Sequence, residues 1–365
     1  MKKFWIIIFS VVTFLLLFLS NGIFKEFRTN SDEMKVGLIL NGEIDDGSWS
    51  ESHYKALEEL QDESSIELIY RENVPCNERS ELVMKELINE GCKLIICNSY
   101  DFGEYELKIA KEYPNINFLH ATGTQYSDNL SSYFGRMYQI RYLTGIVAGM
   151  QTETNEIGYV AAYNIPEVIR GIDAFTLGVR SINPTAKVYV SWCDSWIDDA
   201  KAAKATNELL EKTNIDIITQ HCNSNITLEI ADKAGIWSIG YNLDNSEKYP
   251  NSYLTGAIWN WKDFYLSQVQ LCKSGNFKGK IYWEGYESGR VDLAPFNPKI
   301  KKQVREVVET NMEMLKNGSF DVFNGPIYDN KGIKQVNEGE NLSDNVLLNE
   351  LDWFVKGVEI LNAKE

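Results

Sequence analysis

A tryptophan directly after a short acidic turn is the first residue whose type and position could do chemistry. Trp49 follows the sequence Asp-Asp-Gly-Ser at residues 45–48. It could be the first core residue of the helix that follows. It could also offer a flat face to a planar ligand, because an aromatic ring provides a large contact area with little loss of rotamer freedom. Asp46 in the same turn supplies a carboxylate, so Trp49 and Asp46 are the first binding candidates.

Two histidines and one arginine extend this set. His221 ends an apolar strand, where it could meet a ring nitrogen of a ligand or serve as a satisfied structural residue. His53 follows Trp49 by one helical turn and has the same two interpretations. Arg170 stands near the start of a helix, where it could meet a carboxylate across a cleft or join a structural ion pair. These residue types favour ligand binding over covalent chemistry.

The spacing of cysteines, histidines and catalytic motifs in the sequence supports neither a metal site nor an enzymatic mechanism. The six cysteines show no C-x-x-C spacing and the chain has only three histidines, so no zinc site is expected. Cys92, Cys97 and Cys222 lie beside apolar strands and are expected to be small buried hydrophobes rather than disulfide partners. The sequence contains no nucleophile–base pair and no G-x-x-x-x-G-K phosphate loop, which predicts a protein that is not an enzyme and needs no cofactor.

Composition limits the class of partner. The 365 residues allow two domains of ordinary size, and a hydrophobic content of 44% is enough to build their cores. The 36 basic residues are outnumbered by 52 acidic ones, for a net charge of −16. Phosphate binding needs clustered lysines and arginines, so nucleic acid is not expected as a partner.

The N-terminus predicts export. Lys2 and Lys3 precede an uncharged apolar run at residues 4–19, and we interpret residues 1–22 as a signal peptide or membrane anchor. The lysine pair places the N-terminus inside and the rest of the chain outside the membrane. No cysteine follows the run directly, which excludes lipid attachment there. Residues 23–34 then form a tether.

The elements that must position these candidates alternate between strand and helix. The stretch Lys35–Leu60 reads as an apolar strand, a turn and an amphipathic helix, and similar units follow it. Such alternation predicts an α/β protein with parallel sheets flanked by helices, in which ligands bind at the carboxyl ends of the strands. The expected strands are 36–40, 66–70, 93–97, 117–120, 132–134, 156–160, 187–191, 215–220, 237–240 and 252–257, and the expected helices after the first are 77–90, 105–112, 138–149, 167–181, 200–212, 228–233 and 260–273.

This series divides into two similar lobes. The short polar turn at residues 151–155 separates two complete α/β sets and is the expected first crossing. Lobe 1 is then expected to hold 35–151 and 256–290, and lobe 2 to hold 152–255 and 291–365. Several hinge strands would join the lobes.

Separated motifs over almost the whole exported part resemble one family. The chain looks like a basic membrane protein, the purine-nucleoside-receptor type of ABC transporter substrate-binding protein. This family has a two-lobed periplasmic-binding-protein fold of type I. The stretches that carry the resemblance are IDDGSWSESH (44–53), HATG (120–123), SYFGRMYQIRYLTGIVAG (132–149), IGYVAAYNIPEVIRGIDAFTLGVRSINP (157–184), SWIDDAKAAKA (195–205), VDLAPFNP (291–298) and the segment from GPIYDNKGI to DWFVKGVE (325–359).

The resemblance implies an aromatic sandwich. In the family, aromatic residues at the positions of Trp49 and Trp196 stack on the two faces of a purine, and a carboxylate at the position of Glu104 accepts hydrogen bonds from the base. Two aromatic faces and one acceptor suit a flat heterocycle with N–H groups. Taken singly, Trp196 could be a core residue and Glu104 a helix cap.

Departures from the family concern the sugar. Nucleoside-binding members carry an Asp where this chain has Asn242, followed here by Asp244, and a Lys where it has Trp259. An indole offers one donor and no acceptor, so Trp259 cannot replace a Lys at a ribose hydroxyl. This substitution favours a free nucleobase such as adenine, although Asn242 still allows a nucleoside.

The resemblance therefore implies an extracytoplasmic binding protein of an ABC importer. Its partners would be a purine and the importer's permease and ATPase subunits, and the protein is expected to be a monomer. A membrane-tethered purine receptor or sensor without a transport role is the alternative. The sequence does not separate the two, because they differ only in their partners.

Overall fold

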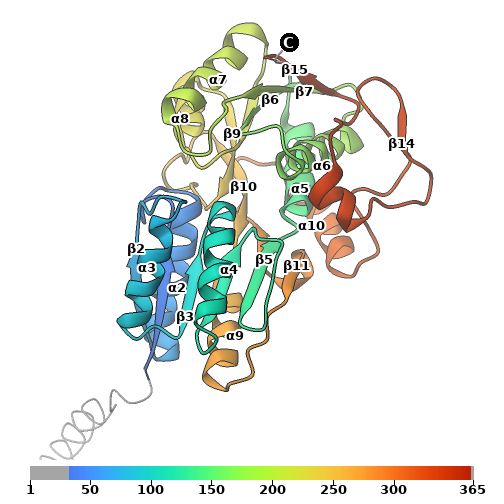
Figure 1. Cartoon of the computed structure of the whole chain (residues 1–365). Helices are drawn as coiled ribbons and strands as arrows, with labels where there is room; N and C mark the ends of the chain where they lie inside the picture. The colour runs from blue at the N-terminus through green and yellow to red at the C-terminus, as the bar shows by residue number, and fades with distance from the viewer. Residues whose placement is uncertain (1–32, 363–365) are drawn as a thin grey trace, which may run out of the picture.

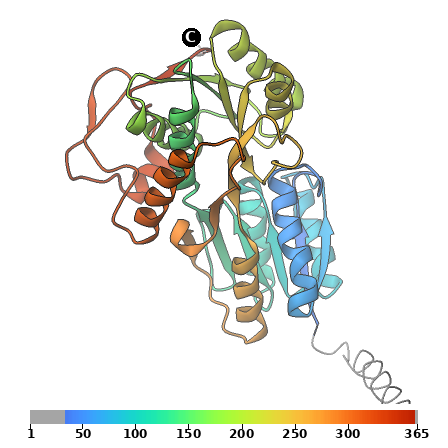
Figure 2. The same cartoon turned by 180° about the vertical axis from the view of Figure 1, so that it is seen from behind.

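The computed structural model describes residues 33–362, which form two α/β lobes, one above the other in Figure 1 and seen from behind in Figure 2. The predicted signal or anchor at 1–22 and the predicted tether up to residue 32 lie outside the described residues. Within 33–362 no helix is both long and apolar enough to cross a membrane.

Lobe 1 is built on a parallel sheet of six strands in the order β11-β5-β4-β3-β1-β2. Buried β1 and β3 lie in its middle and are apolar nearly throughout, as a strand covered on both faces must be. The strands are β1 Met34–Ile39, β2 Ile66–Arg71, β3 Leu94–Cys97, β4 Asn117–Ala121, β5 Leu130–Gly135 and β11 Ile281–Glu284, and the helices are α2 Trp49–Ser64, α3 Arg79–Asn89, α4 Gly103–Glu112 and α9 Lys262–Lys273.

Lobe 2 is built on a sheet of seven strands in the order β12-β10-β9-β8-β6-β7-β15, in which only β12 runs antiparallel to its neighbour. The strands are β6 Glu156–Ala161, β7 Lys187–Trp192, β8 Ile217–His221, β9 Trp237–Asn242, β10 Tyr253–Trp259, β12 Val291–Leu293 and β15 Val358–Ile360. The helices are α5 Met137–Gln151, α6 Pro166–Ile182, α7 Asp199–Lys212, α8 Ile226–Ala234 and α10 Lys302–Lys316, and a small hairpin joins β13 Ile327–Tyr328 to β14 Lys334–Val336.

The predicted fold class is confirmed. Each strand and helix expected from the periodicity is present, with its ends shifted by a few residues at most. The C-terminal part, from β11 onward, carries short strands and α10 that the periodicity did not resolve.

The lobe boundaries differ from the expected ones in two places. The first crossing comes at Arg136, before α5, because α5 packs along α6 in lobe 2. A side chain at Gly145 or Gly149 would overlap the backbone of α6, so these glycines allow the two helices to touch closely. The second difference is β10, which pairs with β9 and therefore belongs to lobe 2 up to Trp259.

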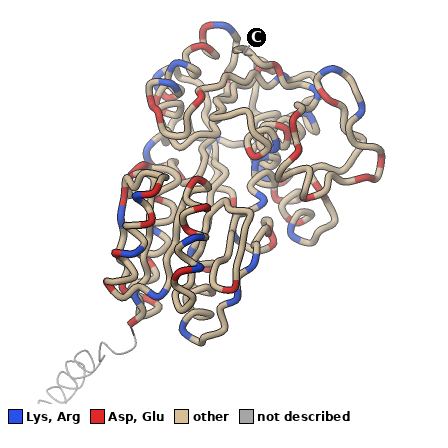
Figure 3. The backbone as a smooth tube through the Cα atoms, viewed as in Figure 1, with Lys and Arg blue, Asp and Glu red and all other residues tan. Residues whose placement is uncertain are grey.

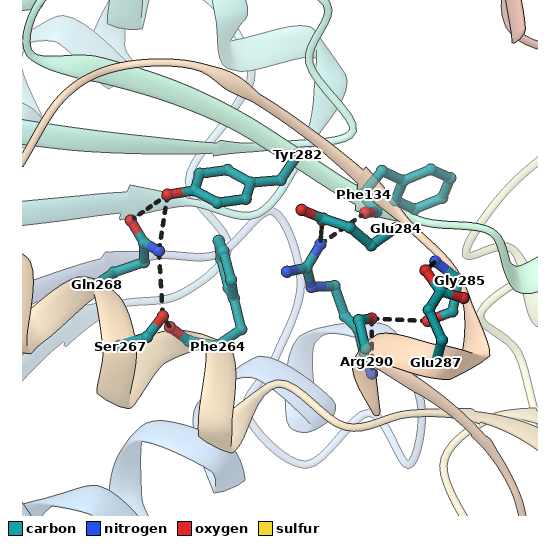
Figure 4. Close-up of polar contacts among 10 residues, drawn as sticks. Phe134, Phe264, Ser267, Gln268, Tyr282, Glu284, Gly285, Glu287 and Arg290 are labelled. Carbon is teal, nitrogen blue, oxygen red and sulfur yellow. Dashed lines mark hydrogen bonds and ion pairs between the residues drawn. The ribbon is translucent and has the colours of Figure 1, made fainter. Parts of the chain in front are cut away.

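Three crossings connect the lobes: β5 to α5, β10 to α9, and β11 to β12. One arginine contacts all of them (Figure 4). Arg290 donates to the backbone oxygen of Phe134 at 3.4 Å, pairs with Glu284, and lies over the Phe264 ring at 4.4 Å. The Arg290 backbone oxygen also accepts from Asn260 at 2.9 Å. Arg290 therefore holds the three crossings together with its charge neutralised.

Candidate site at the interlobe junction

The carboxyl ends of the two parallel sheets face each other, and direct hydrogen bonds join the loops that follow them. We call this region the interlobe junction. Its residues come from both lobes and from the crossings: Gly47, Ser48, Trp49, Phe134, Arg170, Trp196, Gln220, His221, Asn223, Asn225, Asn242, Asn245 and Trp259.

Trp49 lies at the start of α2 and is 8% exposed. Its Nε1 donates to the backbone oxygen of Asn98 at 2.7 Å. Its ring meets Phe134 and Trp259 edge-on, with centroids 6.3 and 5.6 Å away. Trp49 is therefore part of a packed group, which we call the hinge aromatic cluster and which comprises Trp49, His53, Phe134, Trp259 and Trp261.

Asp46 caps α2. Its two carboxylate oxygens accept from the backbone nitrogens of Ser48, Ser50 and Glu51 at 2.8 to 3.1 Å. Burial raises the pKa of Asp46, and these backbone bonds oppose the rise. Because both oxygens are occupied, the contacts of Asp46 are those of a helix cap, at the helix end where a negative charge is favoured.

His53 belongs to the hinge aromatic cluster. Its ring stacks on Trp261 at 5.0 Å, and its Nδ1 is hydrogen-bonded to the hydroxyl of Tyr265. Its Nε2 is buried without a hydrogen-bond partner among the described residues. Burial lowers the pKa of His53 to about 3, so the imidazole is neutral at physiological pH.

Trp259 fills the space beside Trp49. It stacks on Trp261 with centroids 4.6 Å apart and an interplanar angle of 11°, and its Nε1 donates to Asn242 Oδ1 at 2.9 Å. The indole therefore uses its one donor within the protein. No hydrogen-bonding group of Trp259 remains for a sugar.

Asn242 bridges the lobes. It ends β9 with φ of 72°, a left-handed conformation that asparagine tolerates better than most residues. Its Nδ2 donates to Ser48 Oγ of lobe 1 at 2.9 Å and to Asn223 Oδ1 of lobe 2 at 3.0 Å. The residue predicted as a ligand contact is thus also a direct contact between the lobes.

Gly47 receives the second direct contact. Asn225 Nδ2 donates to the Gly47 backbone oxygen at 2.8 Å, and Asn245 Nδ2 approaches the same oxygen at 3.4 Å. Gly47 has φ of 66°, and an added Cβ would lie 2.5 Å from Asn225 Nδ2. Only glycine therefore permits this approach of the lobes.

Trp196 and His221 form an aromatic group on lobe 2. Trp196 is half-buried, and its ring lies 5.6 Å from Tyr163 and 6.2 Å from His221. The ring of Tyr241 meets His221 at 4.7 Å. No ring contact among the described residues joins Trp196 to Trp49, so the two sandwich candidates stand in separate aromatic groups.

Unpartnered polar atoms gather at the end of β8. His221 Nδ1 is hydrogen-bonded to the Tyr159 hydroxyl at 3.1 Å, whereas His221 Nε2 and Gln220 Oε1 are buried without partners among the described residues. Burial, together with the positive charges of Arg141 and Arg170, holds the pKa of His221 well below its usual value. Buried polar atoms are nearly always hydrogen-bonded, so each of these two atoms is suited to a ligand or water as its partner.

Arg141 lies next to the end of β8 and is fully buried. It donates to the Gln220 backbone oxygen at 2.8 Å and to Thr219 Oγ1 at 3.3 Å, and it lies over the Tyr241 ring at 4.0 Å. No carboxylate pairs with it among residues 33–362. Its charge therefore contributes a positive potential behind β8.

Glu104 and Asp244 lie apart from these contacts and are exposed. Glu104 stands in the first turn of α4 and is hydrogen-bonded to the Tyr105 hydroxyl, whose pKa it raises. Asp244 accepts from the Ser246 backbone nitrogen at 2.9 Å, as in an Asx turn. Neither has a hydrogen bond to Trp49 or Trp196.

Residues in or beside the junction that were not singled out from the sequence include Phe134, Arg141, Gln220 and Asn225. A signal existed for two of them. Gln220 and Asn225 stand in the run Gln-His-Cys-Asn-Ser-Asn after a strand, where polar side chains meet at a sheet edge. Phe134 and Arg141 read as ordinary core and surface positions.

Cavities elsewhere do not include the candidate residues. A pocket of about 550 Å³ lies between α5, α6 and residues 318–324, and one of about 160 Å³ lies beside Arg290. Neither is lined by Trp49, Trp196 or His221. Among the described residues no group of three or more His, Cys, Asp or Glu side chains could hold a metal ion. Acidic and basic residues alternate over both lobes (Figure 3).

The sequence also resembles known proteins. Residues 33–320 match the family described as ABC transporter substrate-binding protein, PnrA-like. A purine-binding protein of Brucella abortus (strain 2308) is 32% identical over 330 residues, which cover 90% of this chain and 93% of that one. A putative ABC transporter glucose-binding protein of Haloferax volcanii (strain DS2) is 34% identical, covering 91% and 82%.

Solved structures agree on the fold. An ABC transporter solute-binding protein from Conexibacter woesei superposes with a TM-score of 0.69 at 20% identity, covering 79% of this chain and 98% of that one. At this identity the likeness supports the architecture and not the ligand. The family match spans most of both lobes and includes the junction residues Trp49 and Trp196. The chain therefore belongs to the basic membrane protein family, the PnrA-like substrate-binding proteins of ABC transporters.

Proposed function

We propose that this protein captures a purine, as a free base or a nucleoside, between its two lobes and delivers it to the permease and ATPase subunits of an importer. The observation that carries the proposal is the purine-binding relative, which matches nearly the whole chain. Aromatic groups on both sides of the junction and the unpartnered atoms of Gln220 and His221 support the same ligand, because a purine has flat faces and a polar edge.

The proposed contacts keep the sequence-based candidates as a starting set. Trp49 and Trp196 would each supply one aromatic face, and Asn242 and His221 would supply polar contacts. Trp259 leaves no donor for ribose, which favours the free base. Glu104 would have to move from its present partner Tyr105 to reach a ligand, so we rank it below the others.

Mass spectrometry of the protein purified without refolding tests the ligand class directly. We expect a co-purified purine, and calorimetric titration of the emptied protein should then give saturable binding of that purine. Glucose is the matched alternative, because the Haloferax relative is named for it and aromatic residues can also stack on sugars. Glucose binding without purine binding would replace this proposal.

Transport and sensing are separated by a cellular test. We expect cells that lack this protein to lose uptake of labelled purine, and expression of the full chain to restore it. N-terminal sequencing of the membrane and soluble fractions would show whether residues 1–22 are removed or retained as an anchor. Normal uptake in the absence of the protein would favour the tethered receptor or sensor.

A further inference from the structure

Arg170 is a buried cation at the interlobe junction that lacks a carboxylate partner. It is 5% exposed and lies on α6 of lobe 2, with its guanidinium 5.8 Å from the Phe134 ring and 5.1 Å from the Trp283 ring of lobe 1. Its one hydrogen bond among the described residues runs from Nη1 to the Leu347 backbone oxygen at 3.1 Å. Neither a carboxylate across the cleft nor another ion-pair partner, the two roles considered from the sequence, pairs with Arg170 among the described residues.

Arg136 and Arg290 near the junction are neutralised, whereas Arg170, like the fully buried Arg141 behind β8, forms no ion pair among the described residues. Arg136 lies over the same Trp283 ring and forms two bonds to Asp344, at 2.6 and 2.7 Å. Arg290 pairs with Glu284 (Figure 4). The half-buried carboxylate of Glu167, one helical turn before Arg170, acts on it electrostatically but forms no ion pair with it.

The position of Arg170 places it where a ligand edge would lie. Phe134, under its guanidinium, also contacts Trp49 and Trp259 of the hinge aromatic cluster. The next residue, Gly171, contacts the aromatic group on lobe 2. An added Cβ at Gly171 would lie 2.8 Å from the His221 ring. Arg170 therefore contacts a ring of the hinge aromatic cluster, and its charge acts on His221 of the lobe 2 aromatic group.

A buried guanidinium with unused donors needs an acceptor, because desolvating an unpaired charge is costly. Its planar fork suits two adjacent acceptors. A 6-oxopurine such as hypoxanthine or guanine presents O6 and N7, two acceptors side by side, which is the pair that arginine recognises on guanine. Adenine presents N7 beside an amino group, which would oppose the N–H donors of Arg170.

We infer that Arg170 selects 6-oxopurines over adenine by donating to O6 and N7. This inference rests on the proposed purine binding and narrows the ligand within that class. It differs from the sequence-based expectation of adenine, which considered only the sugar side of the ligand.

Calorimetric titration of hypoxanthine and adenine against four proteins tests the inference. We expect the wild type to prefer hypoxanthine by about tenfold or more, the range expected for hydrogen bonds to a charged group. Arg170→Met should weaken hypoxanthine binding by about 10- to 100-fold and change adenine binding about threefold at most. Arg170→Lys keeps the charge without the planar pair of N–H donors, so its affinity for hypoxanthine should lie between those of the wild type and Arg170→Met.

Arg180→Met is the matched control. Arg180 lies near the other end of the same helix, donates from Nη1 to the Ala186 backbone oxygen at 3.0 Å, and lines the pocket between α5 and α6 rather than the junction. It should change neither affinity. Urea unfolding adds a second readout: if Arg170 served only to hold Leu347, Arg170→Met would destabilise the free protein, whereas an unpaired charge can be replaced by methionine with little or no loss.

The outcomes separate this inference from the proposed function. Wild-type preference for adenine, or an equal loss of both bases in Arg170→Met, would overturn the role of Arg170 while leaving purine binding intact. Failure of the wild type to bind either base would overturn the proposed function and this inference together.

Discussion

The two sides of the interlobe junction are built differently. On the hinge side, Trp49 and Trp259 are packed against other rings, and each indole N–H is hydrogen-bonded within the protein. On the lobe 2 side, Gln220 and His221 keep buried polar atoms without partners among the described residues, and Arg170 forms one hydrogen bond but no ion pair there. Apart from His53 Nε2, the polar side-chain atoms of the hinge aromatic cluster are paired within the protein, whereas several on the lobe 2 side are not.

This difference suggests a division of labour. A satisfied aromatic surface can offer contact area to many flat ligands but does not distinguish their edges. Unpartnered donors and acceptors discriminate, because a ligand that fails to pair them leaves them buried and unsatisfied. We therefore expect changes on the hinge side to affect stability first and changes on the lobe 2 side to affect ligand choice first.

The largest expected effect is on the hinge side. Trp49→Ala removes a side chain that is 8% exposed and should lower the free energy of unfolding by about 3–5 kcal/mol. Trp49→Phe should cost much less. Urea denaturation of both variants measures this, and a loss below about 1 kcal/mol in Trp49→Ala would mean that Trp49 is not part of the core.

Trp196→Ala is the counterpart on lobe 2. Trp196 is half-buried, so we expect a small loss of stability but a loss of about 1–3 kcal/mol in purine binding, or roughly one to two decades in affinity. Calorimetry and urea denaturation of the same variant separate the two effects. Unchanged purine affinity would remove Trp196 from the site.

His53 predicts a pH dependence of stability on the hinge side. Its pKa is about 3 in the folded protein and near 6.5 when unfolded, so the unfolded chain binds more protons between these values. The contribution of His53 is therefore complete above pH 6.5 and is lost as the pH falls toward 3. When the pH falls from 7 to 5, the free energy of unfolding should decrease by about 1–2 kcal/mol less in His53→Gln than in the wild type. Identical losses in urea denaturation would contradict the neutral buried state.

The smallest expected effect on stability concerns the direct contacts between the lobes. Gly47→Ala and Gly235→Ala place the same side chain at φ of 66° and 72°, and each should cost about 1 kcal/mol of stability. Only at Gly47 does the new methyl group meet another residue, Asn225. We therefore expect weaker ligand binding in Gly47→Ala alone.

Small-angle scattering checks the same pair of variants for closure. The wild type and Gly235→Ala should show a smaller radius of gyration with saturating ligand, as hinge closure requires. Gly47→Ala should contract less. Full contraction of Gly47→Ala would show that the Gly47–Asn225 contact does not limit the approach of the lobes.

Much of the fold could be predicted from the sequence because its signals are local. The apolar strands β1 and β3 and the amphipathic helices that follow them are visible as short periodic patterns, and their alternation leads to parallel sheets. The sequence did not predict that α5 belongs to lobe 2. This assignment depends on close helix packing at Gly145 and Gly149, which is a contact with another element rather than a local pattern.

The candidate site divides in the same way. The sequence by itself identified Trp49, Trp196, His221 and Asn242 as residues of the right type at strand and helix ends, and the family resemblance grouped them. Only the tertiary structure decided which side chains already have partners. Asp46 caps α2 and Trp259 donates a hydrogen bond to Asn242, whereas Arg170 forms no ion pair among the described residues. A partner can come from anywhere in the chain, so whether a polar group is satisfied depends on the three-dimensional arrangement and not on the neighbouring sequence.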